Sequence, residues 1–210
     1  MCGRYFVTEQ IWDDVQRDFP EVPAGLVRLP DGDIVPSMEA PALVGGVEAA
    51  RESALLPAML AWGFPGFDGK RPVINARSET AADKPMFAES VRSRRCVLPA
   101  AGFYEWNKAR QKYSFTLDRA SLIYLAGIWR PYGEEQRFVI LTREANESMQ
   151  PVHDRMPLMI PREAVRDWIF DITAAKELLA APLPQLSART EYKQMSLFDE
   201  PELQGGGTGV

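Results

Sequence analysis

Histidine and cysteine are nearly absent from this sequence, which has one His and two Cys in 210 residues. A single histidine excludes a His-rich metal site, and so few ligands argue against structural zinc, so we expect no metal and no cofactor. The two cysteines, Cys2 and Cys96, cannot build a disulfide framework. A reducing cytoplasm is therefore the expected compartment.

Long apolar runs and an excess of positive charge are also missing. No segment approaches the roughly 20 apolar residues that span a bilayer, so we expect no membrane contact. The first residues, Met1-Cys2-Gly3-Arg4, lack the apolar segment of a signal peptide. Twenty-four basic against 29 acidic residues give a net charge of −5, so any nucleic-acid contact has to come from a local basic patch. The length and a hydrophobic fraction of 46% suit one globular domain.

The apolar pattern predicts strands in the middle of the chain and helices at its ends. Thr8 is expected to cap a helix that ends near Pro20, and residues 21–50 read as loops and a hairpin around Gly45-Gly46. Strands are expected at 54–62, 73–76, 95–98, 102–106, 113–117, 121–129, 137–142 and 156–160, and helices at 162–170 and 174–181. The result is one α+β domain over 1–193. An acidic, glycine-rich tail, 194–210, is expected to be flexible.

Four segments stand out for their chemistry: Met1-Cys2-Gly3-Arg4-Tyr5, Ile74-Asn75-Ala76-Arg77-Ser78-Glu79-Thr80, Gly102-Phe103-Tyr104-Glu105-Trp106 and His153-Asp154-Arg155-Met156-Pro157. Their order and spacing, joined by Trp62-Gly63, closely resemble the SRAP family of SOS-response-associated peptidases, proteins that sense abasic sites in single-stranded DNA. The resemblance runs from Met1 to about Pro161. It implies a SRAP-like fold, with a mixed, mostly antiparallel, barrel-like β core and flanking helices.

Cys2 is the centre of the implied chemistry. Removal of Met1 would leave an α-amine and a thiol on one residue, and an α-amine pKa of about 7.7–8.0 leaves an appreciable nucleophilic fraction at neutral pH. The amine can condense with an aldehyde to a Schiff base, and the thiol can then close a thiazolidine ring. A ring-opened abasic site presents such an aldehyde at C1′. The resemblance implies that Cys2 becomes covalently joined to abasic DNA. The alternative is that Cys2 is a structural cysteine without a catalytic role.

Three further residues are catalytic candidates by the same resemblance. Asn75 would orient the amine or the deoxyribose hydroxyls, although it could instead be a strand-end residue that satisfies backbone groups. Glu105 would shuttle protons during Schiff-base formation and Met1 cleavage, unless it points to solvent from its strand. His153 would donate to the sugar hydroxyl and assist crosslink reversal, whereas most lone histidines are structural.

A DNA surface is expected around these segments. Arg77 and Arg155 would contact phosphates, and Trp106 and Phe67 would stack on bases or wedge beside the damaged position. The other basic candidates in or beside the segments are Arg4, Lys70, Arg71 and Lys108. Any one of them could equally be a solubilising surface charge, and either aromatic could be core. Two departures from the family pattern bear on this surface: Asp33 stands in the early loop, and Pro85, not Arg, precedes Met86-Phe87, with Lys84 nearby.

The tail contains a second short pattern. Gln194, Met195, Ser196, Leu197 and Phe198 resemble the peptide by which bacterial proteins dock on the replication sliding clamp, although they could instead pack onto the core.

Taken together, the residues and the family resemblance predict a monomeric, cytoplasmic, nucleoid-associated enzyme of the DNA damage response. The resemblance implies that it crosslinks to abasic single-stranded DNA, with associated autopeptidase and abasic-site lyase activities. Two alternatives stay open. An N-terminal-nucleophile glutamine amidotransferase would also begin Met-Cys-Gly. A non-catalytic DNA-binding module would need no chemistry at Cys2.

Overall fold

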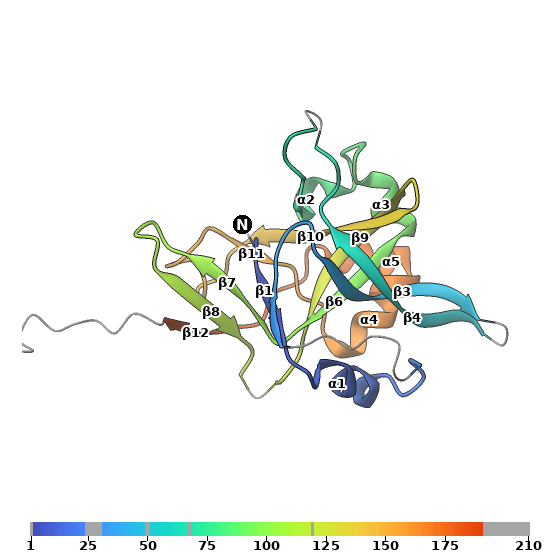
Figure 1. Ribbon diagram of the computed structural model, residues 1–210, viewed down its shortest axis with the longest axis horizontal. Coiled ribbons are helices and arrows are strands. Elements are labelled where there is room, and N and C mark those ends of the chain that lie inside the picture. Colours follow the sequence, from blue (N-terminus) through green and yellow to red (C-terminus); the bar gives the residue numbers. More distant parts are fainter. Residues whose placement is uncertain (1, 24–30, 49–50, 67–68, 119, 191–210) are drawn as a thin grey trace, which may run out of the picture.

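Two β-sheets, one of which closes into a barrel, form the framework of the protein in a computed structural model (Figure 1). The structure describes residues 2–23, 31–48, 51–66, 69–118 and 120–190. The strands of the described residues are β1 (Tyr5–Val7), β2 (Gly32–Ile34), β3 (Glu39–Glu48), β4 (Arg51–Trp62), β5 (Asn75–Arg77), β6 (Arg95–Ala100), β7 (Gly102–Trp106), β8 (Lys112–Thr116), β9 (Ile123–Tyr132), β10 (Glu135–Glu144), β11 (Arg155–Pro157) and β12 (Ser187–Thr190).

The barrel closes because β10 pairs along both of its edges. On one edge it is parallel first to β4 and then to β5, and on the other it is antiparallel to β9 and then to β11. The remaining pairs, β4 with β3, β3 with β6 and β6 with β9, are antiparallel and complete the ring. The predicted mixed, mostly antiparallel, barrel-like α+β fold is confirmed.

The second sheet has the order β12-β8-β7-β1-β2 and is antiparallel throughout. Strand β1 lies between the β7–β8 hairpin and the barrel (Figure 1), with Tyr5 opposite Phe103 of β7. Gly102 permits this close approach, because a Cβ there would lie 2.5 Å from the Phe115 carbonyl oxygen and from the Phe6 ring. The start of the chain is thereby held beside the end of β7.

Helices cover the outside of the barrel. They are α1 (Ile11–Asp18), α2 (Ser78–Ala81), α3 (Ala88–Ser93), the short 3-10 turn η1 (Arg162–Ala164), α4 (Val165–Phe170) and α5 (Ile172–Leu178). Ile11 and Val15, four residues apart, give α1 its buried face. The Asp171 carboxylate begins α5 by accepting the amide protons of Thr173 at 2.7 Å and Ala174 at 3.2 Å.

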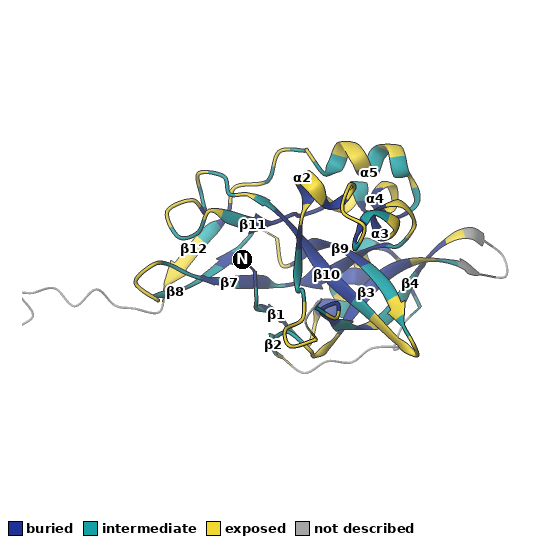
Figure 2. Cartoon of the chain, turned by 90° about the horizontal axis from the view of Figure 1, so that it is seen from above, coloured by how far each residue is buried: buried dark blue, intermediate teal, exposed yellow. Residues whose placement is uncertain are grey.

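Burial separates the two faces of these elements. Figure 2 shows buried residues along the barrel strands and exposed residues on the outer faces of the helices. Among the described residues, no helix is long and apolar enough to cross a bilayer. The same residues contain no group of three or more His, Cys, Asp or Glu side chains placed to hold a metal ion.

Several sequence predictions of local structure were wrong. Thr8 does not cap α1, which begins at Ile11 without a side-chain cap. Residues 39–48, expected in loops or a short hairpin, form one long strand through Gly45-Gly46. These glycines serve packing here, because a Cβ on Gly45 would lie 2.8 Å from the ring of Phe170 on α4. Strands β1, β2 and β12 and helices α2 and α3 were not predicted.

Candidate active site

Cys2 lies three residues before Tyr5, the first residue of β1, and is fully buried. Its thiol is 3.9 Å from the carbonyl oxygen of Arg4, which accepts a weak hydrogen bond. Burial, and then the negative charge of Glu105, raise the pKa of the Cys2 thiol to about 12. The sulfur is therefore a neutral thiol at pH 7, and the site does not hold a standing thiolate.

Asn75, the first residue of β5, reaches the same point from the barrel. Its side-chain Nδ2 donates to the Cys2 carbonyl oxygen at 2.8 Å across 73 residues of sequence. Two contacts fix its place: β5 pairs with β10 beside Ile140, and the Trp62 indole donates to the Ile74 carbonyl at 2.9 Å. The Asn75 Oδ1 atom is buried and accepts no hydrogen bond from the described residues. That oxygen is available to an amine or a hydroxyl.

Glu105 contributes from β7 of the second sheet and is only 4% exposed. Its neighbours Tyr104 and Trp106 are half-buried on the opposite face of the strand. The alternative in which Glu105 points to solvent is therefore wrong. The carboxylate lies close enough to Cys2 to raise the pKa of the thiol. The second sheet therefore brings an acid-base group to Cys2, and the barrel brings the Asn75 amide.

His153 and Trp106 line one hollow of about 690 Å³, and Cys2, Asn75 and Glu105 are not among its lining residues. The His153 Nδ1 atom accepts the Arg155 amide proton at 2.9 Å and lies 3.0 Å from an Asp154 carboxylate oxygen. The loop therefore orients the His153 ring through its own backbone amide and the neighbouring carboxylate. The remaining lining comes from the β7–β8 turn and from residues 150–154, and includes Lys108, which is exposed.

Arg155 is held tightly beside this loop. Its guanidinium makes a two-pronged ion pair with Glu79 at 2.7 and 2.8 Å and also donates to the Thr142 carbonyl at 2.6 Å. The Arg155 hydrogen bonds lower the pKa of Glu79 to about 2. Glu79 is thus paired with Arg155, whose guanidinium the sequence analysis expected on phosphate.

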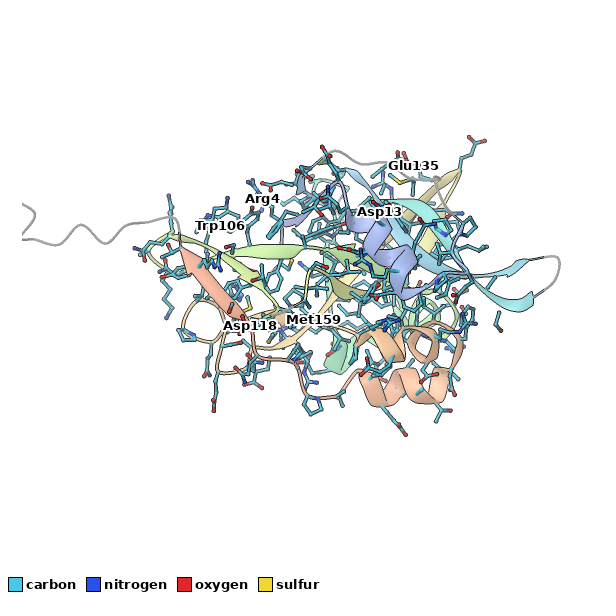
Figure 3. The ribbon with its side chains drawn as sticks, turned by 90° about the horizontal axis from the view of Figure 1, so that it is seen from below. Arg4, Asp13, Trp106, Asp118, Glu135 and Met159 are labelled. Atoms are coloured by element: carbon cyan, nitrogen blue, oxygen red, sulfur yellow. The ribbon has the colours of Figure 1, made fainter. Side chains whose placement is uncertain are left out.

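Arg4 and Trp106 meet on the outer side of the site (Figure 3). The Arg4 guanidinium lies 5.6 Å from the Trp106 ring centroid and 3.1 Å from the Asp33 carboxylate. Asp33, the acid that departs from the family pattern, therefore fixes Arg4 in place. Both side chains stay partly exposed, Arg4 at 39% and Asp33 at 36%.

A second hollow, of about 870 Å³, opens on the other side of Asn75. Arg77 and Lys84 bring positive charge to it, and Arg130, stacked at 5.0 Å over Tyr132, adds a cation that the sequence did not single out. Pro85, Met86 and Phe87 complete much of the apolar lining. Lys70 and Arg71 are exposed nearby in the chain, in the 69–72 segment. Phe67 and the peptide Gln194, Met195, Ser196, Leu197 and Phe198 lie outside the described residues.

Tyr5 is a site residue that sequence reasoning missed. It is fully buried, and burial followed by the charge of Cys2 raises its pKa well above the ordinary value. Its hydroxyl has no hydrogen-bond partner among the described residues. The only indication of this in the sequence is that Tyr5 lies three residues after Cys2. The alternation of side chains along a strand does not predict which of the first residues point into the core.

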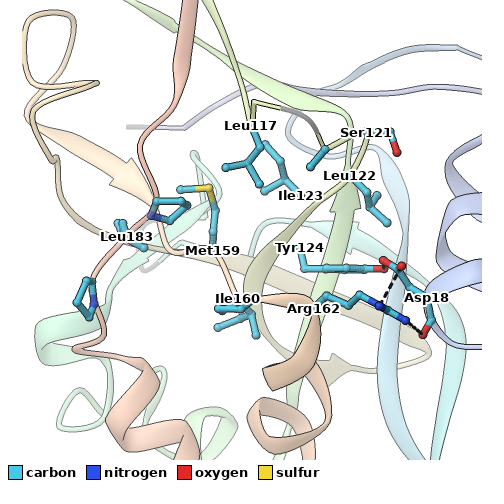
Figure 4. Close-up of a pocket in the computed structure, with 14 residues that line it drawn as sticks. Asp18, Leu117, Ser121, Leu122, Ile123, Tyr124, Met159, Ile160, Arg162 and Leu183 are labelled. Carbon is cyan, nitrogen blue, oxygen red and sulfur yellow. Dashed lines mark hydrogen bonds and ion pairs between the residues drawn. The ribbon is translucent and has the colours of Figure 1, made fainter.

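A third hollow, of about 590 Å³, is separate from this site (Figure 4). It is mainly apolar, and its polar end is closed by Asp18, which accepts a hydrogen bond from Tyr124 at 2.7 Å and pairs with Arg162 at 3.0 Å. None of its lining residues belongs to the four segments singled out in the sequence.

Comparison with known proteins adds to this geometry. Residues 1–197 match the SRAP family, described as SOS response associated peptidase. The match runs past residue 193, where the sequence predicted the domain to end. The abasic site processing protein YoaM of Bacillus subtilis is 29% identical, over 96% of this chain and 94% of its own. YedK of Escherichia coli, also named an abasic site processing protein, is 31% identical over 84% of this chain and 83% of its own.

Solved structures share the fold. A phage-related protein from Bordetella bronchiseptica superposes with a TM-score of 0.73 at 27% identity, covering 91% of this chain and 95% of its own. A protein from Bacteroides thetaiotaomicron, at 17% identity, superposes with a TM-score of 0.74 over 90% of this chain and 91% of its own.

Proposed function

The chain belongs to the SOS response associated peptidase (SRAP) family, and on that basis we propose that it processes abasic sites in single-stranded DNA by forming a thiazolidine crosslink through Cys2. The observation that carries the proposal is the hydrogen bond of 2.8 Å from Asn75 to the Cys2 carbonyl, together with the buried Glu105 carboxylate beside the thiol. Once Met1 is removed, three groups from distant parts of the chain would lie together in one buried place: the Asn75 amide, the Glu105 carboxylate and the Cys2 1,2-aminothiol.

The order of bond formation follows from the ionisation of Cys2. With Met1 removed, the α-amine is the stronger nucleophile, because burial keeps the sulfur protonated. The amine nitrogen would attack the C1′ aldehyde carbon of the ring-opened sugar, and loss of one water would leave an imine. The thiol sulfur would then bond to C1′ while its proton passes to the imine nitrogen, which closes the five-membered ring. The net reaction releases one water and needs no oxidant.

Glu105 would carry the protons in these steps. Its carboxylate is 4% exposed and borders Cys2, so it can accept a proton from the attacking amine and return it to the leaving hydroxyl. Asn75 would hold the Cys2 backbone and offer its unpaired Oδ1 to the amine. His153, across the hollow at Trp106, would donate to the sugar hydroxyl freed by ring opening and assist reversal.

The peptidase activity in the family name would act on Met1. Cys2 would be the nucleophile and Glu105 the proton carrier, and an abasic-site lyase step would use the same imine.

The strand of DNA would run across the hollow lined by Asn75 and the hollow lined by Trp106 and His153. Arg77, Lys84 and Arg130 would meet phosphates on the Asn75 side. Lys108 and the Arg4–Trp106 stack would serve the other side, with Trp106 offering a face to a base. Arg155 would act on phosphate only through its exposed edge, because Glu79 and Thr142 already hold it. Lys70 and Arg71, both exposed, would extend the proposed surface.

The test is the intact mass of the protein after mixing with single-stranded DNA that contains one abasic site. We expect loss of Met1 and a heat-stable adduct smaller by one water than the sum of its parts. Cys2→Ala and Cys2→Ser both keep the α-amine but lose the thiol, so each should abolish the heat-stable adduct and leave only a reversible imine. Cys96→Ala is the matched control, because Cys96 is the second buried cysteine and lies in β6. A heat-stable adduct that survives in Cys2→Ala, or the absence of any adduct with correctly processed protein, would refute the proposal.

The same samples separate the alternatives. Glutamine hydrolysis without an adduct would favour the amidotransferase, and DNA retention unchanged in Cys2→Ala would favour a binding module. Docking of residues 194–198 on the sliding clamp remains a separate proposal, tested by binding of purified clamp to wild-type protein and to Leu197→Ala/Phe198→Ala.

A further inference from the structure

The outer face of the second sheet carries aromatic side chains where polar ones are usual. Phe6 of β1, and Tyr104 and Trp106 of β7, are half-buried on this face, whereas their neighbours Tyr5 and Phe103 are fully buried on the other. The solvated face of an antiparallel sheet is normally polar. Adjacent aromatic rings on such a face therefore point to a ligand.

Phe6 and Tyr104 form one patch. Their ring centroids lie 4.9 Å apart, with an angle of 36° between the ring planes. Gly102 lies opposite Phe6, and a Cβ on this glycine would lie 2.5 Å from the Phe6 ring, so the ring rests directly against β7. Trp106, two residues and about 7 Å further along β7, continues the patch to the hollow that it shares with His153.

Cations lie over and beside these rings. The Lys112 ammonium of β8 is 3.9 Å from the centroid of the Tyr104 ring. Arg189 of β12 is exposed on the same face, in register with Tyr104 through β8. Among the described strand residues of this face, Asp33 is the one acid, and it is paired with Arg4. A chain with a net charge of −5 thus presents a positive, aromatic surface here.

We propose that Phe6, Tyr104 and Lys112, the outer patch, bind about two nucleotides of the single strand that flanks the abasic site. The bases stack on the two rings, because every base has a π face, and the ammonium holds a phosphate. A base that stacks on Tyr104 moves the ammonium from the ring to a neighbouring phosphate, which the flexible lysine stem permits. That this strand is the one carrying the abasic site rests on the function proposed above.

The test measures affinity for a single strand that carries one tetrahydrofuran abasic analogue, which has no aldehyde and cannot crosslink. Phe6→Leu/Tyr104→Leu keeps an apolar cover over Gly102 but removes the rings, and should weaken binding about tenfold. The loss should depend on the flank on one side of the analogue. It should disappear when that flank is replaced by propanediol spacers, which keep the phosphates and carry no base.

The matched control for these leucine substitutions is Phe170→Leu. Phe170 on α4 is also half-buried beneath a cation, with the Arg166 guanidinium 5.3 Å from its ring centroid, and it lies outside the proposed DNA surface. We expect Phe170→Leu to bind the strand as wild type does. An equal loss in this control, or a loss that persists with propanediol spacers on both sides, would mean that the rings only support the fold and would overturn the proposal.

Lys112→Gln tests the outer patch without changing the packing of the core. It should weaken binding about two- to threefold at about 50 mM salt. It should also make the slope of log affinity against log salt shallower by about 0.7, the value for one phosphate of a single strand. Wild-type affinity in both Lys112→Gln and the double leucine variant would overturn the proposal.

The outcomes distinguish the outer patch from the proposed function. A flank-dependent loss in the leucine variant, together with no heat-stable adduct between wild type and aldehydic abasic DNA, would refute the crosslinking function and leave the patch as a binding site for single-stranded DNA. A heat-stable adduct in wild type, with affinity unchanged in the leucine variant, would leave the function standing and overturn the patch.

Discussion

Replacement of Glu79 by glutamine tests how the His153–Arg155 loop is held. Glu79 lies at the start of α2, and both of its carboxylate oxygens accept hydrogen bonds from Arg155 of β11, at 2.7 and 2.8 Å. Arg155 also spans to the Thr142 carbonyl on β10. The carboxylate therefore ties the loop that carries His153 to the helix that follows Asn75 and Arg77. Glutamine keeps the shape but accepts only one of the two bonds.

The magnitude follows from the pKa of Glu79, which falls from 4.5 to about 2. A shift of that size would correspond to about 3 kcal/mol of folding free energy in a fully buried pair. The Glu79 side chain is 45% exposed, so solvent screening reduces the contribution to about 1 kcal/mol. Because the folded-state pKa is depressed, the stabilisation is complete above pH 4.5 and is lost as the pH falls toward 2.

The assay is urea unfolding of wild type and Glu79→Gln between pH 7 and pH 3, followed by tryptophan fluorescence. We expect Glu79→Gln to be about 1 kcal/mol less stable at pH 7, with the difference shrinking below pH 4.5. Glu89→Gln is the matched control, since Glu89 pairs with Arg94 through a single contact at 2.7 Å and is 65% exposed; its effect should be smaller. A Glu79→Gln difference that is absent at pH 7, or that persists undiminished at pH 3, would contradict this account.

Two substitutions and one labelling experiment on the wild-type protein have expected results. Gly45→Ala should lower the free energy of unfolding by about 1–3 kcal/mol, because its Cβ would lie 2.8 Å from the Phe170 ring. Chemical denaturation measures this difference. No change in the free energy of unfolding would mean that α4 can move to make room. Tyr5→Phe removes a buried hydroxyl without a partner among the described residues, so it should leave the melting temperature unchanged or raise it; a large loss would indicate a bonded hydroxyl. The pKa of Cys2, raised to about 12, predicts that iodoacetamide at pH 8 labels Cys2 only after unfolding, which intact mass would report. It also predicts that the free energy of unfolding falls as the pH rises above 9.0, because the thiol of the unfolded chain ionises first.

The strands were the best predicted part of the fold, because their signal is local. β7 has the predicted limits, 102–106, and β6, β9 and β10 overlap the predicted runs with shifts at their ends. These runs are apolar because the barrel buries them. β3 was missed because Gly45 and Gly46 normally break strands, and only the tertiary contact with α4 and with Leu56 explains them. The three-residue strands β1 and β2 are too short to show any period.

The site was predicted by its segments and not by its contacts. The sequence places Cys2, Asn75 and Glu105 in separate segments, and nothing in their local pattern indicates that two different sheets bring them to one point. The Arg155 side chain was expected on phosphate, but the pairing of Arg155 with Glu79 depends on how β11 and α2 approach across β10. Arg130 and Tyr132 were missed for a similar reason, since they come from β9 and enter the site only by their place in the barrel.

Burial of the Cys2 sulfur has a consequence for the proposed chemistry. A neutral thiol with a pKa of about 12 reacts slowly with oxidants and soluble electrophiles, so the residue is protected while no aldehyde is present. The same neutrality would slow attack on a substrate that arrives from solution. Once the amine has formed the imine, however, sulfur and carbon belong to one molecule, and ring closure gains from proximity instead of from thiolate concentration. The thiol proton is also the one that the imine nitrogen requires. A site that raises the thiol pKa is therefore suited to amine-first capture of a carbonyl, whereas attack of Cys2 on the Met1 peptide would require Glu105 to take the thiol proton as the bond forms.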